Sequence, residues 1–267
     1  MLRDCNTTDQ EPLLERPLPA RSLVASLLLR TRPPRMRGSR LVQWCELFGV
    51  AEGTTRVALS RMVDRGELRS RDGVYELAGR VQSRRGAQDW SLDPVLSRWR
   101  GAWRVAVVAP GPREAGERTA LRDAMRRVRC APIREGVWTR PDNLPRVSAP
   151  AESWKVVDAQ CHWWSARPEG DPAELAADLF DGASWSRRAE MLTDRLSAVT
   201  GVLGGSEPGA LANGFVAGAA SLAHIRADPL LPPELAAGAP AGNALRTAYR
   251  TYEAAFSAAL RAWFLQH

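Results

Sequence analysis

The chain of 267 residues almost lacks lysine: Lys155 is the single lysine among its 37 basic residues. Arginine therefore carries nearly all of the positive charge. Long apolar runs are also missing, since none approaches the ~20 residues that a membrane-spanning helix needs. The first 15 residues include four acidic ones and lack the basic and then apolar layout of a secretion signal. We therefore expect a cytoplasmic protein without membrane contact.

Cysteine is scarce and widely spaced, and its four residues form no CxxC pair: Cys5, Cys45, Cys130 and Cys161. Neither a zinc site nor a disulfide framework is indicated. Cys161 precedes His162, which leaves open a Cys/His nucleophile, but we favour a small apolar cysteine on a strand. A glycine-rich phosphate loop, paired catalytic carboxylates and a Ser-His-Asp order do not stand out either. We expect no enzyme, no metal and no cofactor.

The net charge of +7 is concentrated in the N-terminal third of the chain. Residues 19–104 carry 17 basic and 8 acidic side chains, whereas residues 105–182 and 183–267 have net charges of −1 and +1. Arginine pairs bidentately with phosphate and with the edge of guanine. The clustering of the arginines, more than their number, favours a nucleic-acid partner.

Residues 19–78 have the pattern of three helices and a hairpin. Apolar residues recur every three or four positions in "ARSLVASLLLR" (20–30), in "GSRLVQWCELFGV" (38–50) and at Leu59, Met62 and Val63. The stretch "ELRSRDGVYEL" (67–77) then predicts two short strands around Asp72-Gly73, a pair typical of tight hairpin turns. Residues 1–18 are polar and aperiodic and are expected to be a disordered tail. Residues 31–38 are expected to be a loop.

Three helices followed by a hairpin are the layout of a winged helix-turn-helix. With the apolar face of the third helix inward at about 100° per residue, Thr54, Val57 and Arg61 point outward and can enter a major groove. The hairpin tip and the arginine-rich loop would meet phosphates. The expected DNA contacts are Arg32, Arg35, Arg37, Arg40, Thr54, Thr55, Arg56, Ser60, Arg61, Arg69 and Arg71. The alternative is a solvated basic face that binds an acidic protein and has no operator.

The remaining chain predicts a connector, a mixed sheet domain and a helical domain. Residues 79–97 are expected to form a connector helix. "WRVAVVAPG", "APIREGVWTRP" and "SWKVVDAQCHWW" predict three strands, and "GERTALRDAMRRV" and "DPAELAADLF" predict two helices. This βαββα order indicates a ferredoxin-like sheet with helices on one face in residues 98–182. Residues 183–267 are expected to be all-helical, so the predicted fold class is α+β.

Five segments occur along the chain in the order of a known family: "ARSLVASLL", "FGVAEGTTRVALSRMVDRGEL", "WRGAWRVAVV", "APIREGVWTRPDNL" and "DPLLPPEL". Through them the chain, from about residue 19 onward, resembles the PaaX family of phenylacetic-acid degradation repressors. The resemblance implies a dimeric transcriptional regulator with a winged-helix domain, a central domain like that of the CRISPR-associated protein Cas2 and a helical C-terminal domain. The best-known members are released from DNA by phenylacetyl-coenzyme A.

The Cas2-like domain raises nuclease activity as a rival function. Such a nuclease needs an acidic residue at the end of its first strand, because a metal ion must activate the attacking water. Here that strand ends Val107-Val108-Ala109-Pro110, without a carboxylate. We therefore disfavour a metal-dependent nuclease and interpret residues 98–182 as a dimerisation or coupling domain.

Ten tryptophans either pack between domains or form the walls of an effector pocket. The candidate ligand-binding residues are Arg134, Trp138, Arg140, Trp163, His224 and Arg226. An ion pair between Glu135 and Arg140, or a helix end fixed at Asp228-Pro229, would explain several of them without a ligand. The predicted function is a repressor that binds an inverted-repeat operator in duplex DNA as a homodimer. A small effector, such as an acyl-coenzyme A or an aromatic pathway intermediate, would release it.

Overall fold

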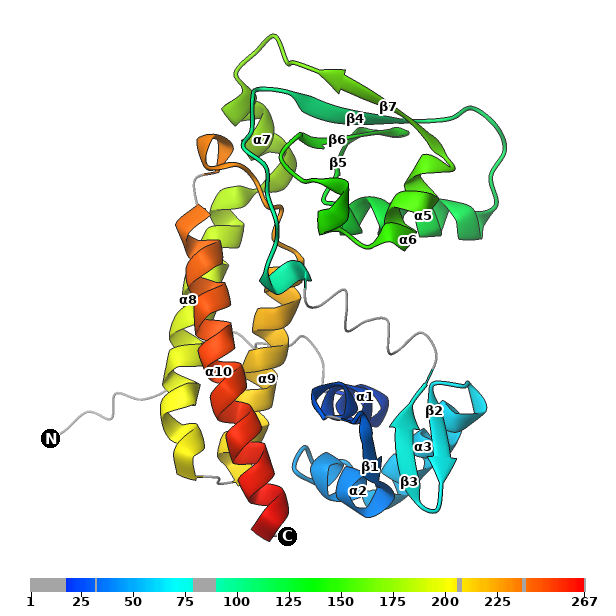
Figure 1. Ribbon diagram of the computed structural model, residues 1–267, viewed down its shortest axis with the longest axis vertical. Coiled ribbons are helices and arrows are strands. Elements are labelled where there is room, and N and C mark those ends of the chain that lie inside the picture. The colour runs from blue at the N-terminus through cyan, green and yellow to red at the C-terminus, as the bar shows by residue number, and fades with distance from the viewer. Residues whose placement is uncertain (1–17, 32, 79–89, 206–207, 237–238, 267) are drawn as a thin grey trace, which may run out of the picture.

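The computed structural model describes residues 18–31, 33–78, 90–205, 208–236 and 239–266. They form two small antiparallel sheets and many helices, so the predicted α+β class is confirmed. In Figure 1 the two sheets, each with its own helices, lie beside the two ends of a long helical bundle. Most of the predicted tail, Arg32 and most of the connector lie outside the described residues. No helix in the described ranges is long and apolar enough to cross a bilayer.

Three helices open the described chain: α1 Ala20–Arg30, α2 Gly38–Glu46 and α3 Glu52–Asp64. Each buries residues at the three- and four-residue spacing expected of an amphipathic helix. Leu23 and Leu27 of α1 meet Leu59 and Met62 of α3 in one core. Gly49, at φ 71°, lies just beyond α2, where glycine adopts the left-handed backbone without a steric penalty.

A three-stranded antiparallel sheet in the order β1-β3-β2 completes this unit: β1 Arg35–Arg37, β2 Leu68–Arg71 and β3 Val74–Leu77. The predicted hairpin is confirmed, and Asp72 and Gly73 form its turn at φ of 51° and 72°. The prediction of a loop for residues 35–37 was wrong, because they pair with β3. Three residues are too few to show strand periodicity, and their partner strand lies far along the chain.

The central unit contains a four-stranded antiparallel sheet in the order β5-β6-β4-β7. Its elements follow one another as β4 Trp103–Val108, α5 Ala115–Arg127, β5 Ala131–Arg134, β6 Val137–Pro141, α6 Ala151–Asp158 and β7 Cys161–Ala166. Two predictions were wrong here. Residues 131–141 form a hairpin instead of one strand, because Gly136 turns the chain at φ 75°. Residues 151–158 form a helix, because Trp154 and Val157 bury one helical face.

The two faces of this sheet have different coverings. Residues directly opposite on neighbouring strands share a face, so Ala106, Trp138 and Trp163 form one row. That row packs against α5 and α6 in a single apolar cluster. Trp103, on the opposite face, packs instead against Ala176 of α7 Pro172–Phe180.

Three helices form the bundle, and residues 182–266 are helical over most of their described length as predicted: α8 Gly182–Val202, α9 Pro208–Arg226 and α10 Ala239–Gln266. The Tyr252 side chain of α10 packs closely against the α9 backbone at Gly218. A Cβ atom there would lie 2.3 Å from the Tyr252 hydroxyl oxygen. Only glycine therefore fits at this contact without a shift of Tyr252.

The N-terminal unit shares its core with the bundle. Trp44 of α2 lies 5.2 Å, centroid to centroid, from Phe215 of α9 in an edge-to-face contact. Arg30 of α1 donates two hydrogen bonds to the Glu253 carboxylate of α10, both at 2.6 Å. Its guanidinium also lies over the Phe256 ring, 5.0 Å from the centroid. The orientation of α1 and α2 is thus fixed by the bundle.

Candidate functional site

The outer side of α3 is exposed and mostly polar, and Val57, which is 51% exposed, also lies on it as predicted. Thr54, Ser60 and Arg61 are all exposed there, in agreement with the predicted orientation. Arg56 is exposed too, but its guanidinium lies 2.6 Å from the carboxylate of Glu52 one turn earlier. The exposed side chains thus comprise hydrogen-bonding groups and guanidinium groups of the kinds that read base edges.

Thr55 does not belong to this surface. Its side chain is fully buried, and its hydroxyl donates to the Ala51 carbonyl over 3.4 Å. It lies one residue from the exposed Thr54, which at 100° per residue is enough to turn a side chain into the core. The prediction of Thr55 as a DNA contact was therefore wrong.

Four arginines gather on one face of the three-stranded sheet. Cross-strand pairing places Arg35 and Arg69 on either side of Glu76, and Arg37 and Arg71 on either side of Val74. Opposite residues share a face, so these four side chains project together, away from Met36 and Tyr75, which pack on the core. We call this surface the arginine face. The sequence carries its signal as two Arg-x-Arg pairs, whose two-residue spacing is that of a strand.

The other loop arginines lie differently. Arg40 is exposed, but its guanidinium lies 5.2 Å from the centroid of the Phe264 ring at the end of α10. Such cation–π contacts are worth about 0.5–1 kcal/mol at exposed sites. Arg40 therefore contacts the bundle, and Arg32 lies outside the described residues.

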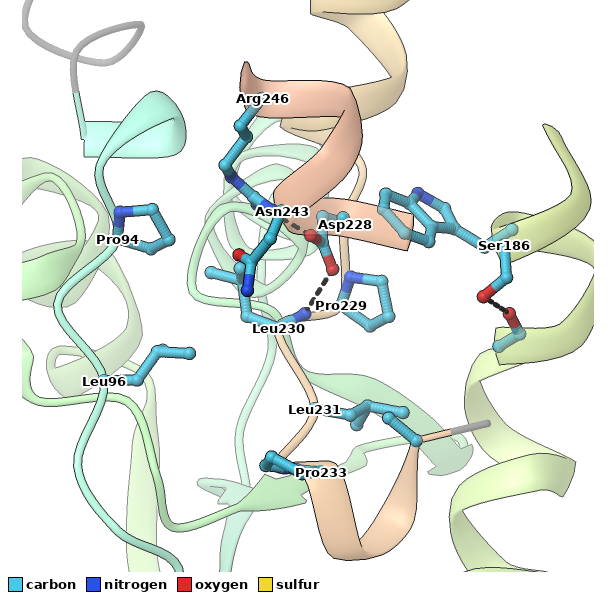
Figure 2. Close-up of a pocket in the computed structure, with 14 residues that line it drawn as sticks. Pro94, Leu96, Ser186, Asp228, Pro229, Leu230, Leu231, Pro233, Asn243 and Arg246 are labelled. Atoms are coloured by element: carbon cyan, nitrogen blue, oxygen red, sulfur yellow. Dashed lines mark hydrogen bonds and ion pairs between the residues drawn. The ribbon is translucent and has the colours of Figure 1, made fainter. Parts of the chain in front are cut away.

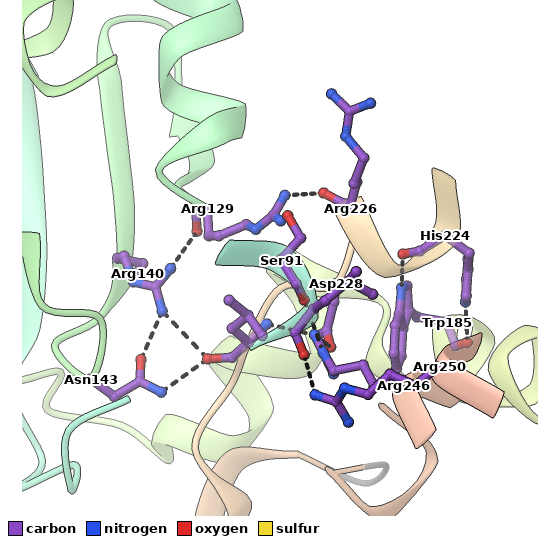
Figure 3. Close-up of polar contacts among 12 residues, drawn as sticks. Ser91, Arg129, Arg140, Asn143, Trp185, His224, Arg226, Asp228, Arg246 and Arg250 are labelled. Carbon is purple, nitrogen blue, oxygen red and sulfur yellow. Dashed lines mark hydrogen bonds and ion pairs between the residues drawn. The ribbon is translucent and has the colours of Figure 1, made fainter. Parts of the chain in front are cut away.

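The second candidate site is a polar cluster between the bundle and the central unit with the four-stranded sheet, which we call the sheet unit (Figure 3). Every buried charged side chain in the described ranges belongs to it: Arg129, Arg140, Asp228 and Arg246. We call these four residues the arginine joint. They come from the segment after α5, from β6, from the segment after α9 and from α10.

Arg140 is 1% exposed and ties three segments together. In the described part of the chain its hydrogen bonds all go to carbonyl oxygens, among them those of Val128 at 3.2 Å, the Asn143 side chain at 2.7 Å and Leu230 at 3.4 Å. Asn143 donates to the same Leu230 carbonyl over 2.9 Å. Two of the segments that carry the family resemblance, "APIREGVWTRPDNL" and "DPLLPPEL", are therefore hydrogen-bonded to each other.

Arg129 and Arg246 extend the joint. Arg246 contacts the Asp228 carboxylate at 2.7 Å and donates to the Ser91 carbonyl over 3.0 Å. Arg129 donates to the Arg226 carbonyl and lies over the Trp90 ring, 4.7 Å from the centroid. Burial, with the neighbouring guanidinium groups, lowers the pKa of Arg129 to about 10, and burial lowers that of Arg140 to about 10. Both side chains remain cationic at neutral pH.

A cavity of about 140 Å³ adjoins the joint (Figure 2). Asp228 and Arg246 form part of its wall together with Trp185 of α8 and the connector residue Leu96. The starts of α8 and α10 meet at this cavity.

The structure does not bring the six predicted ligand residues into this cavity. Arg140 is satisfied inside the joint, Trp138 and Trp163 pack under α5 and α6, and Arg134 is exposed on β5. His224 stacks on Trp185 at 4.7 Å between centroids, and its Nε2 lies 2.9 Å from the Trp185 carbonyl oxygen. Arg226 is exposed and accepts the hydrogen bond of Arg129 through its carbonyl.

The cysteines in the described ranges are buried: Cys45, Cys130 and Cys161. Burial raises the pKa of Cys161 to about 11. Its thiol is therefore protonated at neutral pH, which favours the apolar interpretation over a nucleophile.

A family model and a solved structure both match the chain. The family model of PaaX-like proteins matches residues 19–81. Among solved structures, the uncharacterized protein Rv0674 from Mycobacterium tuberculosis matches with 37% sequence identity and a TM-score of 0.68, over 92% of this chain and 98% of that one. No curated protein matches the chain significantly. The matched segment spans α1 to β3, including α3 and the arginine face, and the chain belongs to the PaaX-like family.

Proposed function

We propose that the protein is a transcriptional regulator that binds duplex DNA sequence-specifically through residues 20–77. We interpret this unit as a winged helix-turn-helix, in which the sheet forms the wing. The observation that carries the proposal is the combination of the exposed polar side of α3 with the arginine face in one unit. A regulator-type function is also what membership of the family suggests.

The two surfaces have different proposed roles. α3 enters the major groove, where Arg61 grips guanine and Thr54 and Ser60 bond to bases or phosphates. The arginine face lies along the backbone or the minor groove and neutralises several phosphates. Its contribution is independent of sequence and falls steeply as salt concentration rises.

A homodimer on an inverted repeat is the proposed assembly, because two-fold protein symmetry requires two-fold operator symmetry. The central unit is the proposed dimerisation or coupling domain. Its β-α-β-β-α-β order and its strand order support a ferredoxin-like, Cas2-like fold. Trp164, on the edge strand β7, is 64% exposed and supports a contact with a second copy there.

The proposed output is repression that a small effector relieves, by family resemblance an acyl-coenzyme A or an aromatic pathway intermediate. An effector must bind two conformations unequally to have any effect. The arginine joint links the sheet unit to the bundle, and the bundle shares its core with the N-terminal unit. A change at the joint would therefore alter the spacing of two α3 helices in a dimer.

The experiment compares two arginine variants on operator and on random duplex DNA. Arg61→Ala is expected to weaken operator binding by about 1–3 kcal/mol and to flatten sequence preference. Arg35→Ala is expected to weaken both DNAs alike and to reduce the salt slope by about one. Arg187→Ala, at an exposed position of α8, is the control and should change neither the affinity for operator DNA nor that for random DNA. Equal losses on both DNAs for Arg61→Ala would contradict the groove assignment.

A further inference from the structure

The cavity beside the arginine joint is formed by parts of the chain that are distant in sequence. Figure 2 shows Pro94 and Leu96 of the connector facing residues 228–233 across the opening. Gly182 and Ser186 line it from the first turns of α8, and Gly242 and Asn243 from the start of α10. Ligand sites occur preferentially at such meeting points between units.

The walls are mostly apolar. Trp185, Leu230, Leu231 and three prolines supply carbon surface, and Asn243 supplies an exposed amide beside it. The volume of about 140 Å³ is close to the ~150 Å³ cavity that accepts benzene in an engineered protein core. One aromatic ring or a short acyl chain therefore fits, whereas a whole coenzyme does not.

The charged residues of the cavity wall, Asp228 and Arg246, are paired with each other, and the two further buried charges of the joint, on Arg129 and Arg140, are both positive. Three of the four buried charged residues in the described ranges are arginines, and Asp228 is the single carboxylate among them. Asp228 is occupied by Arg246 and by the backbone N–H of Leu230 at 2.8 Å. The start of α10 adds the positive end of its helix dipole, which stabilises an anion nearby, whereas the start of α8 is already capped by the Asp181 carboxylate. Within the described residues, the buried positive charge thus exceeds the negative.

We propose that this cavity binds a small carboxylate whose apolar body is one ring or a short acyl chain. The body lies against Trp185 and the leucines, and the carboxylate lies toward Asn243 and Arg246 at the start of α10. Because Asp228 and Arg246 of the joint form part of the cavity wall, ligand binding changes how the sheet unit sits on the bundle. That regulatory consequence rests on the proposed DNA-binding function, whereas binding of the ligand does not.

The test uses benzoate as the probe and benzamide as its neutral match, with the full-length protein and no DNA. Titration calorimetry should detect saturable benzoate binding that is at least about tenfold tighter than benzamide binding, since hydrogen bonds to a charged group contribute more than neutral ones. Absence of benzoate binding, or equal affinity for both probes, would overturn the proposal.

Two variants locate the site without removing a buried charge. Leu96→Trp fills the cavity from an exposed connector position, and Asn243→Asp places a negative charge at its edge, where a helix start tolerates one. Both should weaken benzoate binding tenfold or more, and Val202→Trp, at an exposed site outside the cavity lining, should not. Unchanged binding in Leu96→Trp and Asn243→Asp would overturn the proposal. If the wild-type protein binds benzoate but does not bind DNA, the proposed function is contradicted and the proposed ligand site is not.

Discussion

Among single residues, Arg140 has a structural role that depends on hydrogen-bond partners far from it in sequence, which no local pattern reveals. It lies on strand β6. The hydrogen-bond acceptor farthest from it in sequence is the Leu230 carbonyl, in the segment after α9. The sequence predicts that Arg140 contacts a ligand or forms an ion pair with Glu135. In the structure it instead donates hydrogen bonds to carbonyl oxygens of three segments. The buried carbonyl groups would be left without donors if Arg140 were removed.

Arg140→Leu is expected to lower the free energy of unfolding by about 1–3 kcal/mol, because buried acceptors lose their donor. Arg134→Leu, on the exposed side of the same hairpin, is the matched control. Its free energy of unfolding should stay within about 0.5 kcal/mol of the wild-type value. Urea denaturation measures both. Equal stability of the two variants would show that the joint contributes nothing.

His224 gives the protein a predicted dependence on pH. Burial, assisted by Arg188, lowers its pKa below the ordinary value of 6.5, against the opposing effects of the Trp185 carbonyl and Asp228. Below pH 6.5 the unfolded chain therefore binds more protons than the folded one, and stability falls as pH falls. Denaturation at pH 7 and at pH 5.5 should show this loss, and His224→Gln should reduce it. A loss of equal size in the variant would assign the effect to other groups.

At the scale of elements, prediction succeeds where a pattern is local. The helices at 20–30 and 52–64 and the hairpin around Asp72-Gly73 follow from spacing and turn chemistry. It fails at β1, which needs β3 to exist, and at α6, whose short apolar run fits a helix and a strand equally well. For the candidate DNA surface, the spacing locates Arg61 but misses that Arg35 and Arg69 share a face.

The contact between α9 and α10 at Gly218 carries a sharp prediction. Gly218→Ala places a methyl group against Tyr252 and is expected to cost about 1–3 kcal/mol through overpacking. Gly209→Ala, in the same helix with no atom within 4 Å of the added Cβ, is the control and should be neutral or stabilising by up to about 1 kcal/mol. Thermal unfolding measures both variants, and a neutral Gly218→Ala would contradict the close approach.

At the scale of the whole molecule, one core joins the N-terminal unit to the bundle. The sequence predicts a hydrophobic face for each element, but it does not predict which faces meet. Trp44 and Phe48 pack on Phe215, and Arg30 pairs with Glu253 across the same contact. The two parts should therefore unfold together. This continuity is the physical route by which a ligand at the arginine joint would influence α3.

Glu253→Gln tests this continuity. The substitution leaves the Arg30 charge without its carboxylate and is expected to lower the free energy of unfolding by about 2–3 kcal/mol. This is less than the roughly 3–5 kcal/mol expected on breaking a fully buried pair, because a third of the Glu253 side chain is exposed. Hydrogen exchange should speed up in both α1 and α10, and Glu190→Gln, exposed on α8, should leave it unchanged. Faster exchange confined to α10 would show that the units are independent.

Selection of bound duplexes from a randomised library with the purified protein measures sequence-specific recognition of duplex DNA. We expect enrichment of an inverted repeat whose half-sites lie one helical turn, ~34 Å, or a multiple of it apart, because a two-fold dimer presents two α3 helices. We also expect that Arg61→Ala selects a less defined repeat. Failure to enrich any sequence above the starting library, or a preference for single strands or RNA, would contradict sequence-specific binding of duplex DNA.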